Sequence, residues 1–105
     1  MLRHHIAIIC GMSAPLKGPD PSKTLSSLRD VLAYNVRALR VGKLLSQEQL
    51  GFAADLDRTF VSQVERARVN VSLDNIERIA TALDVPAALL LEVPTLGEKI
   101  KKSPR

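Results

Sequence analysis

The sequence predicts a small all-α domain of five short helices. Three observations support this fold class: apolar residues recur at helical spacing over residues 28–91, no stretch shows sustained strand-like alternation, and hydroxyl or acidic residues precede the apolar stretches where they can cap a helix. Hydrophobic residues make up 46% of the chain but aromatic residues only 3%, so aliphatic side chains must form the core. A chain of 105 residues has room for one such domain and its tails.

The first helix is expected over about residues 28–41. Ser27, followed by Asp30 three residues later, resembles a capping arrangement at its amino end. Gly42 is a natural stop just beyond it. The predicted inward stripe comprises Leu28, Val31, Leu32, Val36 and Leu39.

The second and third helices are expected over about residues 47–55 and 58–66. Residues 46–49 (SQEQ) form a capping box for the second helix, and Asp57 can cap the third. The predicted inward residues are Leu50, Ala54 and Leu56 in the first part, and Val61 and Val64 in the second. The outward residues of the third helix are Arg58, Thr59, Ser62 and Gln63. A short helix that presents arginine, hydroxyl and amide groups outward is suited to reading base edges in a DNA major groove.

The fourth and fifth helices are expected over about residues 73–83 and 86–91. Ser72 caps the fourth, and Pro86 suits the first position of the fifth. The inward stripe of the fourth comprises Leu73, Ile76, Ile79, Ala80 and Leu83. Residues 86–93 carry more apolar side chains than one short helix can bury. We therefore expect a two-fold dimer interface, with packing inside a single chain as the alternative; its expected residues are Leu89, Leu90, Leu91 and Val93.

The net charge of +4 is concentrated in the two ends of the chain. Residues 1–25 and 96–105 carry the basic excess, whereas residues 26–95 are close to neutral. We interpret these three ranges as a flexible amino-terminal tail, a folded domain and a basic carboxyl-terminal tail. A nearly neutral domain can still bind DNA if its few basic groups lie on one face.

Several protein classes are excluded by what the chain lacks. The lone Cys10 excludes an internal disulfide and a cysteine-rich zinc site, and His4 and His5 have too few further ligands nearby to hold a metal. The apolar patch at residues 6–10 is too short for a secretory signal, and no run is long enough to span a membrane. We expect a cytoplasmic protein without cofactor, metal or membrane partner, and not an enzyme, because no acid/base pair lies on rigid elements. Met12 as an alternative start is left open.

Taken together, the helices and their motifs resemble the lambda-repressor-like, Cro/Xre-type helix-turn-helix family over about residues 32–93. The matching pieces are VRALR at 36–40, LSQEQL at 45–50, LDRTFVSQVE at 56–65, Asn70, and IATALDV at 79–85. The resemblance implies a compact five-helix DNA-binding domain with flexible termini. It also implies a dimeric transcription regulator that reads DNA through the helix at about 58–66.

The resemblance assigns roles to individual residues. It implies base contacts by Arg58, Thr59 and Gln63; Ser62 lies on the same face and is a weaker candidate. Arginine can donate two parallel bonds to guanine, and glutamine can pair with adenine. Phe60 is open between a contact with DNA and packing on the preceding helix.

Contacts with DNA phosphates are expected around this helix. Gln47 lies at the amino end of the second helix, where free backbone amides suit an anion. Lys43, Arg68 and Asn70 lie in flanking loops, and Asn70 can equally be a turn residue that bonds its own backbone.

The resemblance also implies an ion pair between Arg40 and Glu65 that orients the recognition helix. Two positions depart from the family, which favours glycine where this chain has Asp55 and Ala67. Aspartate tolerates the left-handed conformation. A left-handed alanine costs about 1 kcal/mol, so either that cost is borne or the third helix runs on by a residue or two.

The predicted function is that of a homodimeric, sequence-specific transcriptional regulator that binds double-stranded DNA at a palindromic operator. The alternative is an antitoxin or another interaction module whose main partner is a protein. A restriction–modification controller, a phage-type repressor and a toxin-partner antitoxin all fit a chain of this size. The sequence names neither the operator nor the direction of regulation.

Overall fold

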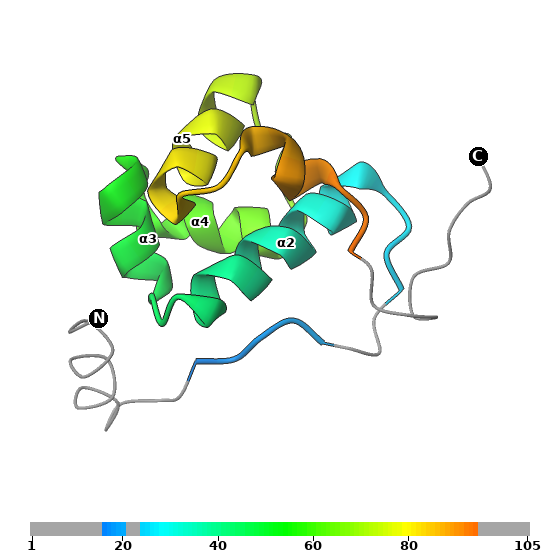
Figure 1. The fold of residues 1–105 in the computed structure, drawn as a ribbon, viewed down its shortest axis with the longest axis horizontal. Coiled ribbons are helices and arrows are strands. Elements are labelled where there is room, and N and C mark those ends of the chain that lie inside the picture. The colour runs from blue at the N-terminus through cyan, green and yellow to red at the C-terminus, as the bar shows by residue number, and fades with distance from the viewer. Residues whose placement is uncertain (1–15, 21–23, 95–105) are drawn as a thin grey trace.

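Five helical elements follow one another through the described part of the chain, residues 16–20 and 24–94 of a computed structural model. The four α-helices are α2 (Leu28–Gly42), α3 (Gln47–Ala54), α4 (Arg58–Glu65) and α5 (Leu73–Leu83), and a 3-10 helix, η2 (Ala87–Leu91), comes last. The described residues contain no strand, which confirms the predicted all-α class. Figure 1 shows η2 lying beside α2, with α3 and α5 toward the left of the view and α4 between them and α2. None of the described helices is long and apolar enough to cross a lipid bilayer.

All five elements contribute side chains to one hydrophobic core. The predicted inward residues of α3 and α4 are confirmed: Leu50 and Val61 are fully buried and Leu56 packs against the core. Burying side chains of this size removes them from water at a gain of roughly 1.5–3 kcal/mol each. The central buried cluster comprises Leu32, Val36, Leu50, Val61, Val64, Ile76, Ile79, Ala80, Leu83 and Leu90.

Two predicted core leucines are exposed instead. Leu28 is 59% exposed and Leu73 is 78% exposed. Each is the first residue of its helix, and helical side chains lean toward the amino terminus, so these two side chains extend past the end of the core. Helical periodicity indicates which face of a helix points inward, but it does not reveal where the core ends along the helix axis.

The helix starts follow the sequence closely. Each α-helix begins with a side-chain oxygen that accepts a hydrogen bond from a backbone amide of the first turn, and α3 has the full reciprocal capping box. The Asp30 carboxylate bonds the backbone and hydroxyl of Ser26 and not the backbone of Ser27, so the start of α2 is not a true box. The four capping residues are Ser27, Ser46, Asp57 and Ser72.

The helix ends are less conventional. After each α-helix the chain passes through a left-handed residue that is not glycine, and these residues are Leu44, Asp55, Ala67 and Asp84, with φ between 58° and 61°. The predicted stop at Gly42 is wrong, because Gly42 is still helical and Leu44 makes the turn. The left-handed Asp55 is confirmed, and since α4 ends at Glu65, Ala67 bears its conformational cost.

The predicted fifth α-helix is wrong in type. Residues Ala87–Leu91 form a 3-10 helix, with Pro86 just before it as the capping residue. The Leu89 amide donates to the Pro86 carbonyl at 3.0 Å, the tight bond that short 3-10 segments use. The structure therefore has four α-helices and a 3-10 helix in its described residues, not five α-helices.

Most of the two predicted tails lies outside the described residues. His4, His5, Cys10 and Met12 are there, as are residues 96–105. Residues 16–20 are described and are not helical. They run alongside α2 (Figure 1), where Pro19 and Asp20 line a cleft with α2 and the end of α4.

Candidate nucleic-acid interface

The turn between α3 and α4 fixes the relative positions of the two helices. Asp55 is left-handed, and the Leu56 amide donates back to the Gly51 carbonyl at 2.8 Å. Gly51 is essential here because a Cβ atom at this position would lie 2.6 Å from the Leu56 carbonyl oxygen. No sequence motif predicts this role of Gly51, since the close approach depends on how the turn folds back onto the helix.

The outward face of α4 is as predicted. Val61, Val64 and Glu65 are buried, whereas Arg58 and Thr59 are exposed. Ser62 and Gln63 are half-buried. Within the described part of the chain, no side-chain hydrogen bond occupies any of these four polar residues, so their donors and acceptors are available to a ligand.

Phe60 is half-buried and packs against the hydrophobic core. Of the two interpretations of this residue, the structure supports packing inside the chain. Part of the ring remains accessible on the α4 surface.

The end of α4 is held by a buried carboxylate. Glu65, whose side chain is fully buried, accepts hydrogen bonds from Arg40 Nε at 2.6 Å and Arg40 Nη2 at 2.9 Å. The third nitrogen, Arg40 Nη1, donates to the Leu45 carbonyl at 2.8 Å. The implied Arg40–Glu65 ion pair is therefore present, and it is bidentate, which adds geometric specificity.

Two further donors reach the same carboxylate. Arg37 Nε and Gln47 Nε2 each donate to Glu65 Oε1 at 3.1 Å. We call the four side chains Arg37, Arg40, Gln47 and Glu65 the Glu65 network. It joins α2 to the first residue of α3 and the last residue of α4, so α4 is held at its carboxyl end by both neighbouring helices.

The structure brings only some of the predicted phosphate contacts together. Gln47 is half-buried, and one of its amide hydrogens is engaged by Glu65, which leaves the other hydrogen and its oxygen. Lys43 is exposed at the end of α2, and Arg68 is exposed in the loop after α4. Asn70 is exposed farther along that loop, at the edge of a separate apolar cleft.

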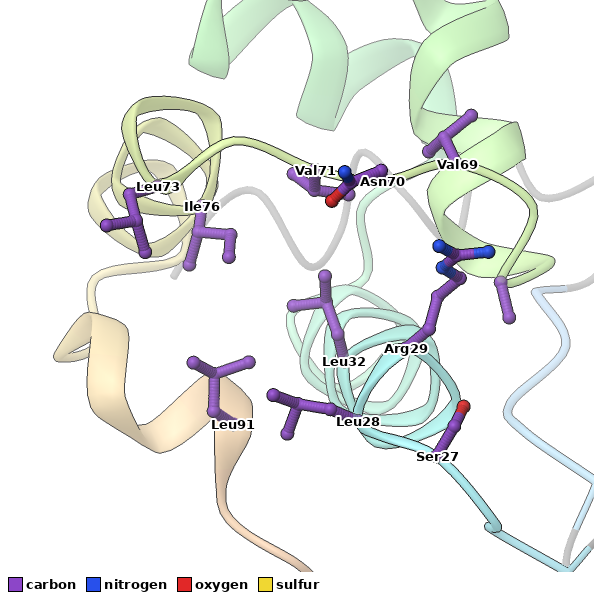
Figure 2. Close-up of a pocket in the computed structure, with 11 residues that line it drawn as sticks. Ser27, Leu28, Arg29, Leu32, Val69, Asn70, Val71, Leu73, Ile76 and Leu91 are labelled. Atoms are coloured by element: carbon purple, nitrogen blue, oxygen red, sulfur yellow. The ribbon is translucent and has the colours of Figure 1, made fainter.

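That apolar cleft lies between the amino ends of α2 and α5 and has a volume of about 570 Å³. Figure 2 shows Leu28, Leu73 and Leu91 converging on it from three elements. Leu89 and Val93 are also exposed, by 37% and 49%. Leu90, in contrast, is fully buried, so its predicted place in a dimer interface is wrong: it belongs to the core.

Among the described residues, no group of three or more His, Cys, Asp or Glu side chains is arranged to hold a metal ion. The Glu65 carboxylate is already occupied by its own chain's donors.

Comparison with known proteins agrees with this geometry. A family model described as helix-turn-helix matches residues 36–90. A hypothetical transcription factor of Neisseria meningitidis is 49% identical over 83 residues, covering 79% of this chain and 74% of the relative. The chain belongs to this helix-turn-helix family. It is a DNA-binding transcriptional regulator, as the resemblance to the Cro/Xre type predicted.

Other proteins to which this chain is similar are control proteins. The control protein C.BamHI of Bacillus amyloliquefaciens is 45% identical and covers 69% of this chain and 90% of its own length. Among solved structures, the Neisseria transcription factor superposes with a TM-score of 0.71 at 51% identity over 75% of this chain and 91% of that one. The restriction-modification controller C.AhdI of Aeromonas hydrophila superposes with a TM-score of 0.58 at 47% identity. The match covers 59% of this chain and 94% of C.AhdI.

Proposed function

We propose that the regulator is a homodimer that reads a palindromic operator with one α4 helix in each half-site. The observation that carries this proposal is the outward face of α4, where unoccupied polar groups stand on a helix whose carboxyl end is held by the buried Glu65 network. A rigid support matters because base recognition needs side chains placed to within a fraction of an ångström.

Direct base contacts are assigned to the exposed first turn and the middle of α4. Arg58 is suited to donate two parallel bonds to the O6 and N7 atoms of a guanine, and Gln63 to pair with an adenine. Thr59 and Ser62 supply hydroxyl groups on the same face. Since Phe60 is partly accessible, its ring edge is available to a thymine methyl group at the margin of this surface.

Phosphate contacts are assigned to the residues that flank α4. Lys43 and Arg68 are exposed cations on either side of the helix-turn-helix unit, and Gln47 retains one amide hydrogen for a phosphate oxygen. Asn70, the fourth predicted contact, is exposed and lies beside the apolar cleft.

We assign the interface of the homodimer to apolar side chains near the carboxyl end of the domain. Leu89 and Val93 remain exposed from the predicted set, and the half-buried Leu91 lines the apolar cleft together with the exposed Leu28 and Leu73. Two-fold symmetry would place two recognition helices one helical turn of DNA apart and multiply the specificity of a single helix.

Similarity to control proteins supports a controller-type role for the regulator over the antitoxin alternative. The relative C.BamHI is matched over 90% of its length, so the likeness extends beyond the helix-turn-helix unit alone. Such a regulator would act on promoter DNA and would need no cofactor.

Selection of bound duplexes from a random DNA pool tests operator reading. We expect a two-fold symmetric motif for the wild type, and a loss of roughly 1–3 kcal/mol per contact with relaxed preference at one position per half-site for Arg58→Ala and Gln63→Ala. Arg78→Ala, on the exposed side of α5, is the matched control and should select the wild-type motif. Recovery of no motif by the wild type would overturn direct readout.

Sedimentation equilibrium tests the dimer. The wild type should be dimeric at concentrations on the order of tens of micromolar, and Leu89→Glu or Val93→Glu should shift it to monomer, because each places a charge on the apolar surface. A monomeric wild type under these conditions would contradict the interface.

A further inference from the structure

Arg37 has bonding capacity that the fold leaves unused. Arg40, with a side chain only 5% exposed, uses all three of its nitrogens inside the protein. Arg37 is 28% exposed and uses only Nε, which donates to Glu65. Within the described residues, no acceptor is bonded to its two terminal nitrogens.

The Glu65 network carries excess positive charge, although the cleft beside Arg37 does not. The single Glu65 carboxylate faces two guanidinium groups, so the Glu65 network has a net charge of one positive unit. Arg37 also lines a cleft of about 300 Å³ together with Arg66 and Arg68 from the segment after α4. Asp20 and Asp30 line the same cleft, so it is a mixed surface and not a general anion basin.

Arg37 adjoins two of the proposed phosphate contacts. It shares the Glu65 Oε1 atom with Gln47 on one side, and the cleft with Arg68 on the other. The Arg37 guanidinium therefore adjoins two residues that we propose as contacts with the DNA backbone.

We propose that Arg37 is a DNA-phosphate contact whose guanidinium bridges Glu65 and one phosphate of the operator backbone. The proposal rests on the operator binding proposed above. Because Nε is already held by Glu65, the side chain is oriented before DNA arrives and loses little freedom on binding. Its terminal nitrogens then donate to phosphate oxygens, a geometry for which the planar guanidinium is well suited.

The test is the salt dependence of operator affinity, measured by fluorescence anisotropy with a labelled duplex between about 50 and 300 mM KCl. Arg37→Gln keeps a donor for Glu65 but removes the charge. It should lower the slope of log K against log salt by about one per protomer and weaken binding at 0.1 M salt about five- to tenfold per protomer, equally for operator and scrambled DNA. Arg37→Lys keeps the charge and should retain the wild-type slope.

Arg78→Gln is the matched control, because Arg78 is also an exposed, ion-paired arginine but lies on α5. Its slope should equal that of the wild type. Thermal unfolding of each variant separates loss of a contact from loss of structure.

An unchanged slope in Arg37→Gln, with a wild type that binds its operator, overturns the proposal and leaves the operator function intact. An equal decrease in the salt slope for Arg37→Lys and Arg37→Gln would also overturn the proposal, since the charge of residue 37 would then be irrelevant. A wild type that selects no operator removes the proposed function and this contact with it.

Discussion

Helix α2 is attached to two other parts of the molecule by hydrogen bonds from its polar side chains. One attachment is charged and the other is neutral. Toward α3 and α4, Arg37 and Arg40 meet the Glu65 carboxylate in a charged network. Toward η2, the Asn35 amide donates to the carbonyls of Leu90 at 2.8 Å and Glu92 at 2.9 Å. The charged attachment orients α4, the proposed recognition helix, whereas the neutral one fixes the segment that carries the exposed Leu89 and Val93.

Because one attachment is charged and the other neutral, we expect different effects when each is removed by mutation. Removing one partner of a buried ion pair leaves a charge that is poorly solvated, while removing an amide leaves two carbonyls without donors. Loss of the charged attachment should therefore cost more stability and should affect DNA recognition first. Loss of the neutral attachment should cost less and should affect assembly first.

The largest effect is expected for Glu65→Ala. This change leaves Arg40 buried without its partner and should lower the free energy of unfolding by about 3–5 kcal/mol, as measured by urea denaturation. Arg78→Ala breaks an exposed ion pair with Asp55, a residue whose side chain is 94% exposed, and should cost less than about 1 kcal/mol. A double-mutant cycle with Arg40→Ala completes the test, and a coupling energy of zero would refute the orienting role of the pair.

A smaller effect is expected for Asn35→Ala. The loss of donors to Leu90 and Glu92 should lower the free energy of unfolding by about 1–3 kcal/mol. It should also weaken the dimer in sedimentation experiments, since η2 loses its attachment to α2. Asn35→Asp is the closest variant in shape, but its ionised carboxylate cannot donate. It should be at least as damaging as Asn35→Ala, and a stable, dimeric Asn35→Asp would show that these hydrogen bonds are unimportant.

The helix-turn-helix unit was largely predictable from sequence because its determinants are local. Ser46 and Asp57 cap helices from positions just ahead of them, and the polar face of α4 follows from helical spacing alone. Family resemblance added the Arg40–Glu65 pair, which joins residues 25 apart in sequence.

The remaining features depend on contacts that no local pattern encodes. Asn35 bonds a carbonyl 55 residues away, and Arg37 reaches across 28 residues to Glu65. Gly51 is needed only because the following turn folds back onto it. Leu90 belongs to the core and not to the predicted dimer surface. Three consecutive leucines at 89–91 look alike in sequence, and only packing reveals which of them points inward.

The smallest effect is expected in the loop that follows α4, just after Glu65. Ala67, two residues after Glu65, has φ of 58°, which an L-residue other than glycine adopts at a cost of about 1 kcal/mol. Ala67→Gly should relieve that strain and raise the free energy of unfolding by about 0.5 kcal/mol, after allowance for the greater freedom of glycine in the unfolded chain. Ala53→Gly, at an exposed helical position in α3, is the matched control and should lower it by about 1 kcal/mol. If urea denaturation shows that both changes destabilise the protein equally, Ala67 is unstrained. The left-handed turn that follows Glu65 would then carry no conformational cost.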